Sequence, residues 1–267
     1  MPKFFVVKLL SLLAASLLPC ISYASPNNPV STHETTPKIL NFGVEITNYQ
    51  PYYFLDKNKN YQGAAREILD LFAETINYSS NYTPVPVARL FNKFLNGDID
   101  FKFPSNPIWS DNLKKNANVF YSEPIFKVKE NVLILESFAK EKNQFNKKKQ
   151  NTVKDIGTIL GFTTPGIDKN IENKEVRLIQ AKSIEQLIHM LVSERVQGVY
   201  FNEKVALLLA KKMYPTINII SSTKFQPFIY GYHLSSINHP ELIDTFNLFL
   251  NSHAKEIEKI KKRYGLN

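Results

Sequence analysis

The residues able to act as acids, bases, nucleophiles or metal ligands are few and are not spaced for catalysis. Five histidines are scattered along the chain: His33, His189, His233, His239 and His253. None of them forms the closely spaced pair typical of zinc sites. The sequence also lacks a G-x-S-x-G nucleophile turn and a phosphate-binding P-loop. Glu203 is the only acid–base candidate that we can name. We therefore predict no catalytic residue, no metal site and no cofactor, and expect a protein that binds a partner rather than converting it.

Size and charge narrow the possible partners. The chain has 267 residues, of which 43% are hydrophobic, enough for one large domain or two modest lobes. Its net charge is +9, but the lysines are spread and the one dense block, at 147–149, is typical of a solvated surface. No nucleic-acid-binding motif accompanies these lysines. We expect a monomer with a small-molecule partner and no nucleic-acid partner.

The N-terminal segment has the pattern of an export signal. Lys3 and Lys8 flank the start of an apolar run that is too short to span a bilayer comfortably. Ser22 and Ala24 supply the small residues that a signal peptidase accepts, so residues 1–24 are predicted to be a signal peptide cleaved after Ala24. A retained N-terminal anchor is the alternative.

The composition of the chain after residue 24 favours a location in the bacterial periplasm. Residues 25–37 are rich in proline and small polar residues and predict a flexible leader. Cys20 is the only cysteine, so cleavage would leave a chain without disulfides. Exported small domains of eukaryotes commonly depend on disulfides, whereas periplasmic proteins need not.

Hydrophobic periodicity predicts alternating strands and helices. Strands are expected at 39–44, 99–103, 131–135, 158–162 and 198–201. Helices are expected after Gly63, at 90–95, from Ser183, at 203–213, from Pro240 and at 254–264. Ser183 and Gln186 have the spacing of a capping box, and Gly97 suits a helix C-terminus. This order favours an α/β fold, a sheet covered by helices.

Several short strings also occur in a characteristic order. They are Tyr49-x-Pro51-Tyr52, Leu95-Asn96-Gly97-Asp98-Ile99-Asp100, Tyr121-Ser122-Glu123-Pro124 and Lys262-Arg263-Tyr264-Gly265-Leu266. With these strings, residues 38–267 resemble the family 3 extracytoplasmic solute-binding proteins, which deliver amino acids to ABC transporters.

The resemblance implies a type II periplasmic-binding-protein fold, in which two α/β lobes are joined by a two-strand hinge and hold the ligand between them. Lobe 1 would comprise 38–125 and 225–267, lobe 2 would comprise 130–222, and the hinge would cross near 126–129 and 223–225. The implied function is capture of a small polar or anionic solute for an ABC permease. A stand-alone sensor with a membrane signalling partner is the alternative, and a cyclohexadienyl-dehydratase-like enzyme is a less favoured one.

The resemblance also implies ligand-facing positions. Tyr49 would cover the ligand, and hydroxyl or amide groups would come from Ser105, Asn106, Thr163 and Thr164. Each has a structural alternative: a half-buried loop tyrosine, a turn at Ser105–Asn106 and helix capping at the threonines.

Two departures from the family pattern bear on the ligand. Asn112 stands where the amino-acid binders have an arginine for the ligand carboxylate, and Asn202 where they have an aspartate for its ammonium. We therefore expect a ligand other than an ordinary L-amino acid. Arg89 or Lys102 could supply a cation for an anionic solute, although Arg89 also suits a surface helix start. Trp109 could stack on a ring or pack near the hinge.

The first prediction concerns processing. The mature protein should begin at Ser25, because Pro19 disfavours lipidation of Cys20 and the small residues lie downstream. N-terminal sequencing of protein released from the periplasm checks this. A chain that begins at Cys20 and fractionates with the membrane would contradict it.

Overall fold

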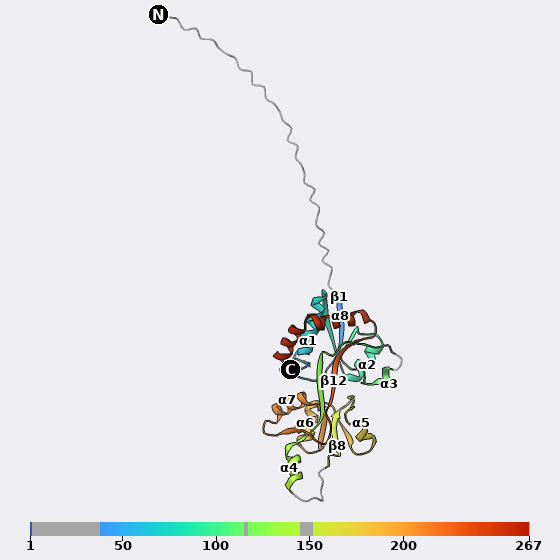
Figure 1. Cartoon of the computed structure of the whole chain (residues 1–267), viewed down its shortest axis with the longest axis vertical. Coiled ribbons are helices and arrows are strands. Elements are labelled where there is room, and N and C mark those ends of the chain that lie inside the picture. The colour runs from blue at the N-terminus through green and yellow to red at the C-terminus, as the bar shows by residue number, and fades with distance from the viewer. Residues whose placement is uncertain (2–37, 115–116, 145–151, 267) are drawn as a thin grey trace. The chain divides into compact units, whose positions relative to one another are not determined.

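The central feature of the fold is a mixed sheet flanked by helices, seen in the computed structural model (Figure 1). The structure describes residues 1, 38–114, 117–144 and 152–266. The predicted signal peptide (1–24), the leader (25–37) and the lysine block at 147–149 lie outside these residues. No helix in the described part of the chain is long and apolar enough to cross a membrane.

Twelve strands contribute to the sheets. Their bounds are β1 Lys38–Glu45, β2 Phe54–Leu55, β3 Tyr61–Gln62, β4 Tyr78–Val85, β5 Phe101–Ser105, β6 Phe120–Tyr121, β7 Phe126–Leu135, β8 Asp155–Ile159, β9 Arg177–Ala181, β10 Gly198–Asn202, β11 Ile219–Ser221 and β12 Phe228–Ser236. The main path through the large sheet is β4-β1-β5-β12-β7-β10-β8-β9. Strands β6 and β11 pair beside this path with β12 and β7, and β2 pairs with β3 separately.

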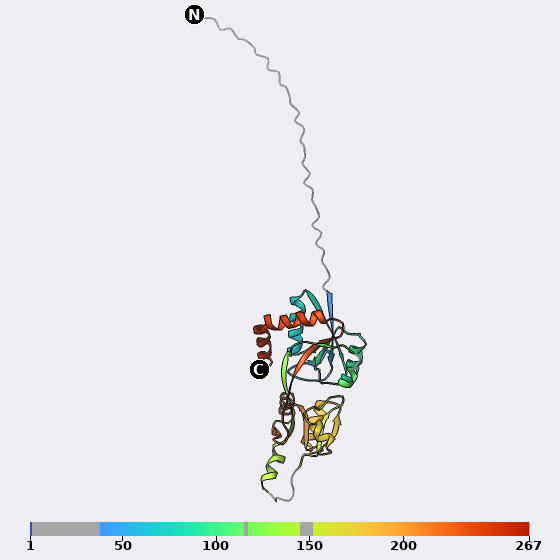
Figure 2. The same ribbon diagram turned by 45° about the vertical axis from the view of Figure 1, so that its right-hand side comes forward.

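Nine helices occur in the same described ranges. Their bounds are α1 Ala64–Thr75, α2 Val87–Leu95, α3 Asp111–Lys114, α4 Glu136–Gln144, α5 Asp168–Glu172, α6 Ile184–Val192, α7 Glu203–Met213, α8 Pro240–Ser252 and α9 Ala254–Arg263. Helices α1, α2 and α8 pack on the part of the sheet that contains β1 and β12, whereas α6 and α7 pack on the part that contains β8 and β10. The turned view in Figure 2 shows the same separation into two groups.

Two long strands connect these groups. Strand β7 pairs antiparallel with β10 on one side and with β12 on the other, and β12 continues along β5. The chain therefore passes from one part of the sheet to the other within β7 and returns within β12. The segment 223–225, expected as a hinge crossing, precedes β12.

Aromatic packing stabilises the group around α1 and α8. Phe72 and Phe246 are fully buried, and their ring centroids lie 4.8 Å apart. Phe249 completes the cluster at 5.4 Å from Phe72. In the other group, the apolar face of α6, with Leu187, is buried against the sheet.

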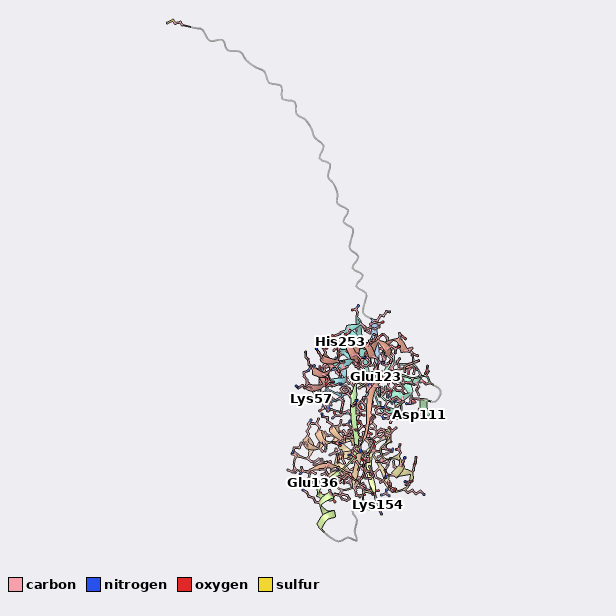
Figure 3. The ribbon with its side chains drawn as sticks, in the orientation of Figure 1. Lys57, Asp111, Glu123, Glu136, Lys154 and His253 are labelled. Atoms are coloured by element: carbon pink, nitrogen blue, oxygen red, sulfur yellow. The ribbon has the colours of Figure 1, made fainter. Side chains whose placement is uncertain are left out.

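Charged side chains come from many separate parts of the surface. Figure 3 labels examples, of which Lys57, Asp111 and Glu123 are exposed and belong to three different segments. Within the described ranges, no group of three or more histidine, cysteine or acidic residues could hold a metal ion.

The predicted local signals correspond to observed helix ends. The Ser183 hydroxyl accepts a hydrogen bond from the Gln186 N–H at 3.2 Å, although the Gln186 side chain accepts from Lys182 rather than from Ser183. Gly97 has a positive φ of 79° after α2. Pro240 begins α8, as its missing N–H allows.

Two strands are shifted from their predicted positions. Strand β8 begins at Asp155 and ends at Ile159 rather than 162, because the chain turns at 160–161, where Gly161 has a positive φ of 87°. Strand β5 runs two residues further than predicted, so Ser105 is its last residue. Lys102 lies between Phe101 and Phe103 on this strand and is fully buried like them, because both faces of β5 are covered.

The second prediction tests the aromatic core with a matched pair on α8. Phe246→Ala should lower the free energy of unfolding by about 3–5 kcal/mol, since it leaves a cavity against Phe72. Leu248→Ala, whose side chain is exposed, should change it by less than about 0.5 kcal/mol. Denaturant unfolding checks both variants. Equal losses would show that the Phe72–Phe246 contact does not carry this part of the core.

Candidate functional site

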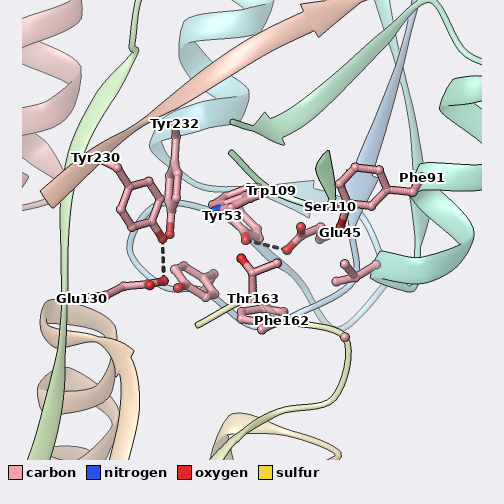
Figure 4. A pocket seen from close by; sticks show the side chains of 13 residues that line it. Glu45, Tyr53, Phe91, Trp109, Ser110, Glu130, Phe162, Thr163, Tyr230 and Tyr232 are labelled. Atoms are coloured by element: carbon pink, nitrogen blue, oxygen red, sulfur yellow. Dashed lines mark hydrogen bonds between the residues drawn. The ribbon is translucent and has the colours of Figure 1, made fainter. Parts of the chain in front are cut away.

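A pocket lies where residues from both groups of helices and strands meet, and we call it the aromatic pocket (Figure 4). Thirteen residues line it. They are Glu45, Tyr49, Tyr53, Val87, Phe91, Trp109, Ser110, Glu130, Gly161, Phe162, Thr163, Tyr230 and Tyr232. Loops that follow strands in open α/β sheets commonly form ligand sites, and here the segments after β1, β5 and β8 all contribute.

Strand geometry positions the polar side chains. Tyr230 and Tyr232 are two residues apart on β12, so they face the same side of the sheet. Glu130 lies on β7 opposite Phe228 of β12 and opposite Asn202 of β10. Glu45 is the last residue of β1. Sheet register therefore fixes four of the lining residues.

Aromatic rings make most of the wall. Tyr49 stacks on Tyr53 with centroids 5.1 Å apart, and it also approaches Phe162 at 6.2 Å and Phe201 at 5.0 Å. Tyr49 follows β1, whereas Phe162 follows β8, so these contacts join the two groups of elements. Such rings offer flat apolar surfaces and polarised faces.

Trp109 forms a second part of this wall. Its ring lies edge-on to Tyr230 and Tyr232, at centroid distances of 5.6 and 5.7 Å. The space left between the rings is a cavity of about 30 Å³. That volume holds about two water molecules, so a larger solute requires the side chains to separate.

Glu130 is a buried carboxylate, and none of the described residues forms an ion pair with it. It is 6% exposed, and its Oε1 accepts a hydrogen bond of 2.5 Å from the Tyr230 hydroxyl. Its Oε2 has no hydrogen-bond partner among the described residues. Burial raises the pKa of Glu130 to about 7, although the tyrosine hydroxyls oppose this shift. The group therefore titrates near neutral pH.

Glu45 is the second carboxylate of the pocket, and its surroundings differ. It accepts a hydrogen bond of 2.8 Å from the Tyr53 hydroxyl. Burial raises its pKa above the ordinary value, while the nearby Lys102 ammonium acts in the opposite direction. Lys102 thus offsets part of the charge of Glu45.

Lys102 lies behind the pocket wall rather than in it. Its Nζ donates a hydrogen bond of 2.5 Å to the Pro104 carbonyl and lies over the rings of Phe91 and Trp109, at 4.4 and 5.7 Å from their centroids. Burial lowers the pKa of Lys102 to about 8. A solute in the pocket would meet the two rings before it met the ammonium.

The structure brings three of the predicted site residues together: Tyr49, Trp109 and Thr163 all line the pocket. Tyr49 is 1% exposed, more deeply buried than a half-buried loop tyrosine. Four other polar candidates, in contrast, form hydrogen bonds with other groups of the protein.

Each of these candidates has an identified hydrogen-bond partner within the protein. The hydroxyls of Ser105 and Ser235 are bonded at 2.8 Å, and the Asn106 amide donates to the Gly231 carbonyl at 2.8 Å. Thr164 donates to Asp168 at 2.8 Å. Asn202 caps α7, since its Oδ1 accepts from the Val205 N–H at 3.1 Å. None of these four candidates is in the lining.

Arg89 does not line the pocket either. It is exposed on the first turn of α2, while Val87 and Phe91 of the same helix face the cavity. The side chain of Asn112 lies outside the described part of the structure. The lining therefore contains two carboxylates and, within the described ranges, neither lysine nor arginine.

Sequence reasoning missed the most polar members of the pocket, Glu45 and Glu130. For each of them, the sequence contains a feature that could have indicated its place in a pocket. Glu130 occupies a strand face whose neighbouring positions, Val128 and Val132, are apolar, and Tyr230-x-Tyr232 has the spacing of one strand face. Glu45 precedes the tyrosine-rich loop that was expected to cover a ligand.

Comparison with known proteins agrees with this architecture. The model of the bacterial extracellular solute-binding proteins, family 3, matches residues 40–267. None of the curated proteins compared with the chain matches it.

Solved structures share the fold at low sequence identity. An ancestral arginine-binding protein bound to arginine has 19% identity and a TM-score of 0.66, covering 85% of this chain and 97% of that one. A putative ABC-transporter binding component from Wolinella succinogenes, complexed with lysine, has 13% identity and a TM-score of 0.68, covering 86% and 96%. An ancestral amino-acid-binding precursor of cyclohexadienyl dehydratase has 18% identity and a TM-score of 0.65, covering 85% and 95%. These similarities establish the two-lobed type II fold.

The third prediction follows from the buried Glu130. Its pKa is raised on folding, so the folded state binds the proton more tightly than the unfolded state does. Its contribution to stability should therefore be lost as the pH rises between about 4.5 and 7. Glu130→Gln removes this titration and should become progressively more stable than the parent over that range.

Denaturant unfolding at several pH values checks this difference. Glu241→Gln on α8 is the control, because that carboxylate is largely exposed. A pH-independent difference between Glu130→Gln and the parent would contradict the raised pKa.

Proposed function

Because the chain belongs to family 3 of the bacterial extracellular solute-binding proteins, we propose that it captures a small solute in the aromatic pocket and delivers it to an ABC permease. The proposed site of action is the periplasm, after removal of residues 1–24. The observation that carries the proposal is a pocket whose lining comes from both groups of elements in the fold.

Capture by lobe closure explains this lining. We assign residues 38–125 and 225–267 to one lobe and residues 130–222 to the other. Strands β7 and β12 pass between them. The contacts from Tyr49 to Phe162 and Phe201 would then close the pocket, and they must open for a solute to reach it.

The acid–base candidate named from the sequence is not placed for a dehydratase-like activity. Glu203 was the one acid–base candidate, and its carboxylate is engaged by Lys129 at 2.8 Å and by the Ser221 hydroxyl at 2.7 Å. It does not line the aromatic pocket. A catalytic acid must reach the proton that it transfers, and this side chain is held elsewhere.

The absence of arginine and lysine from the described lining argues against ordinary amino acids as ligands. An α-carboxylate enclosed here would have no cationic partner in the lining, and it would lie near two acidic side chains. Burying an unpaired charge costs several kcal/mol, enough to remove micromolar affinity. The same argument disfavours the anionic solutes that the sequence suggested, since neither Arg89 nor Lys102 lines the pocket.

The fourth prediction tests this function. Native mass spectrometry of the purified protein should detect a co-purified small solute. That solute, once identified, should raise the melting temperature and decrease the radius of gyration in X-ray scattering. Neutral amino acids such as alanine, serine and leucine should shift the melting temperature by less than about 1 °C at millimolar concentration.

Two results would count against this prediction. An unchanged radius of gyration with saturating solute would contradict lobe closure. Clear stabilisation by several ordinary amino acids would contradict the proposed specificity.

A further inference from the structure

We propose that the solute is a small organic amine without a carboxylate of its own, bound as a cation through Glu130. This inference rests on the proposed binding function and specifies the chemical class of its ligand. The carboxylate of Glu130 would form the ionic hydrogen bond, and the surrounding rings would enclose the carbon skeleton.

The first support is an unused hydrogen-bond acceptor. Figure 4 shows Glu130 at the pocket with the Tyr230 hydroxyl directed at it. That hydroxyl occupies Oε1, while Oε2 is buried and makes no hydrogen bond of normal geometry in the described chain. The Tyr200 hydroxyl, which accepts from the Gly166 N–H, lies close enough to lower the pKa of Glu130 but does not complete a hydrogen bond to Oε2. Buried polar atoms in folded proteins are nearly always hydrogen-bonded, so an unpartnered carboxylate oxygen at a ligand pocket requires a donor. An ammonium N–H is the strongest donor for this position.

The second support is the charge balance. Glu45 already has the buried Lys102 ammonium near it, and Lys102 favours its ionised form. No lysine or arginine in the described ranges acts on Glu130 in this way. The titratable groups that face it are tyrosines, namely Tyr230 and Tyr232 on β12, Tyr200 on β10 and Tyr49 after β1. One positive charge in the pocket would neutralise the remaining carboxylate, which predicts a monocation.

The third support is the nature of the wall. Trp109, Tyr49 and Phe162 surround the same cavity as Glu130. Aromatic faces attract cations and also cover apolar groups. The Trp109 ring already lies beneath Lys102, which shows that this wall accommodates an ammonium group. An anion would face both the carboxylates and the negative ring faces.

The fifth prediction compares ligands that differ mainly in charge. Isothermal titration calorimetry would use benzylamine, benzyl alcohol and benzoate, and a second series of butylamine, butanol and butyrate. At least one amine should bind at least about tenfold more tightly than its alcohol, and neither carboxylate should bind. Alkylammonium groups remain protonated near neutral pH, so the charge of the probe is constant.

The matched variants assign this preference to Glu130. Glu130→Gln retains an acceptor for Tyr230 but removes the charge, so it should weaken amine binding by at least about tenfold and leave the alcohol unaffected. Glu241→Gln should bind the amine like the parent. A cooperative thermal transition in each variant excludes loss of folding as the cause.

Titration of Glu130 provides a second readout. A cation binds the ionised carboxylate, so amine affinity in the parent should be about tenfold weaker at pH 6 than at pH 8, for a group that titrates near 7. Glu130→Gln should lose this dependence. An amine affinity that is independent of pH in the parent would overturn the assignment of Glu130.

The outcomes also separate this inference from the proposed function. An acidic or neutral co-purified solute that binds tightly would overturn the amine assignment and leave the solute-binding function intact. Equal binding of amine and alcohol would do the same. A protein that carries no solute and is stabilised by none of the compounds tested would overturn both.

Discussion

The burial of Glu130 is the constraint on which the site depends. This residue occupies the middle of β7, the strand that pairs with both β12 and β10, so its side chain is held by the register of three strands. A carboxylate in such a place is unfavourable unless its oxygens are paired. Tyr230 satisfies one oxygen, and the surrounding residues leave the other to the contents of the pocket. The fold thus contains a buried acceptor that has no hydrogen-bond partner among the described residues.

The remaining polar groups near the pocket form hydrogen bonds within the fold. Asn202 begins α7, Ser105 is bonded to Ser235 across neighbouring strands, and Thr164 is bonded to Asp168 beside α5. Each occupies a position that the family resemblance marks for ligand contact. In this chain these groups bond within the protein, although the Nδ2 of Asn202 has no partner among the described residues. The pocket lining consists mainly of aromatic rings and two carboxylates. Similar folds can therefore hold their ligands with different groups.

Much of the architecture could be predicted from sequence, because helix caps and hydrophobic periodicity are local signals. Ser183, Pro240 and Gly97 each marked a helix end that the structure contains. The pocket was less predictable, since its polarity depends on side chains brought together from distant strands. Glu130 and Tyr230 are one hundred residues apart and meet only through the pairing of β7 with β12. Lys102 also shows that the position of a side chain depends on the assembled fold. Its charge suggested a ligand contact, but coverage of both faces of β5 placed it behind the wall.

The small volume between the rings has a kinetic consequence. The cavity between the rings has a volume of about 30 Å³, so a solute larger than about two water molecules must displace Tyr49 or Phe162 both to enter and to leave. Release must therefore wait for these rings to part, whatever the strength of the contacts inside. The residence time of a bound solute is then limited by the rate at which the protein opens, and solutes of different affinity can share the same slow step. A receiving protein that holds the rings apart would accelerate release without competing for the solute.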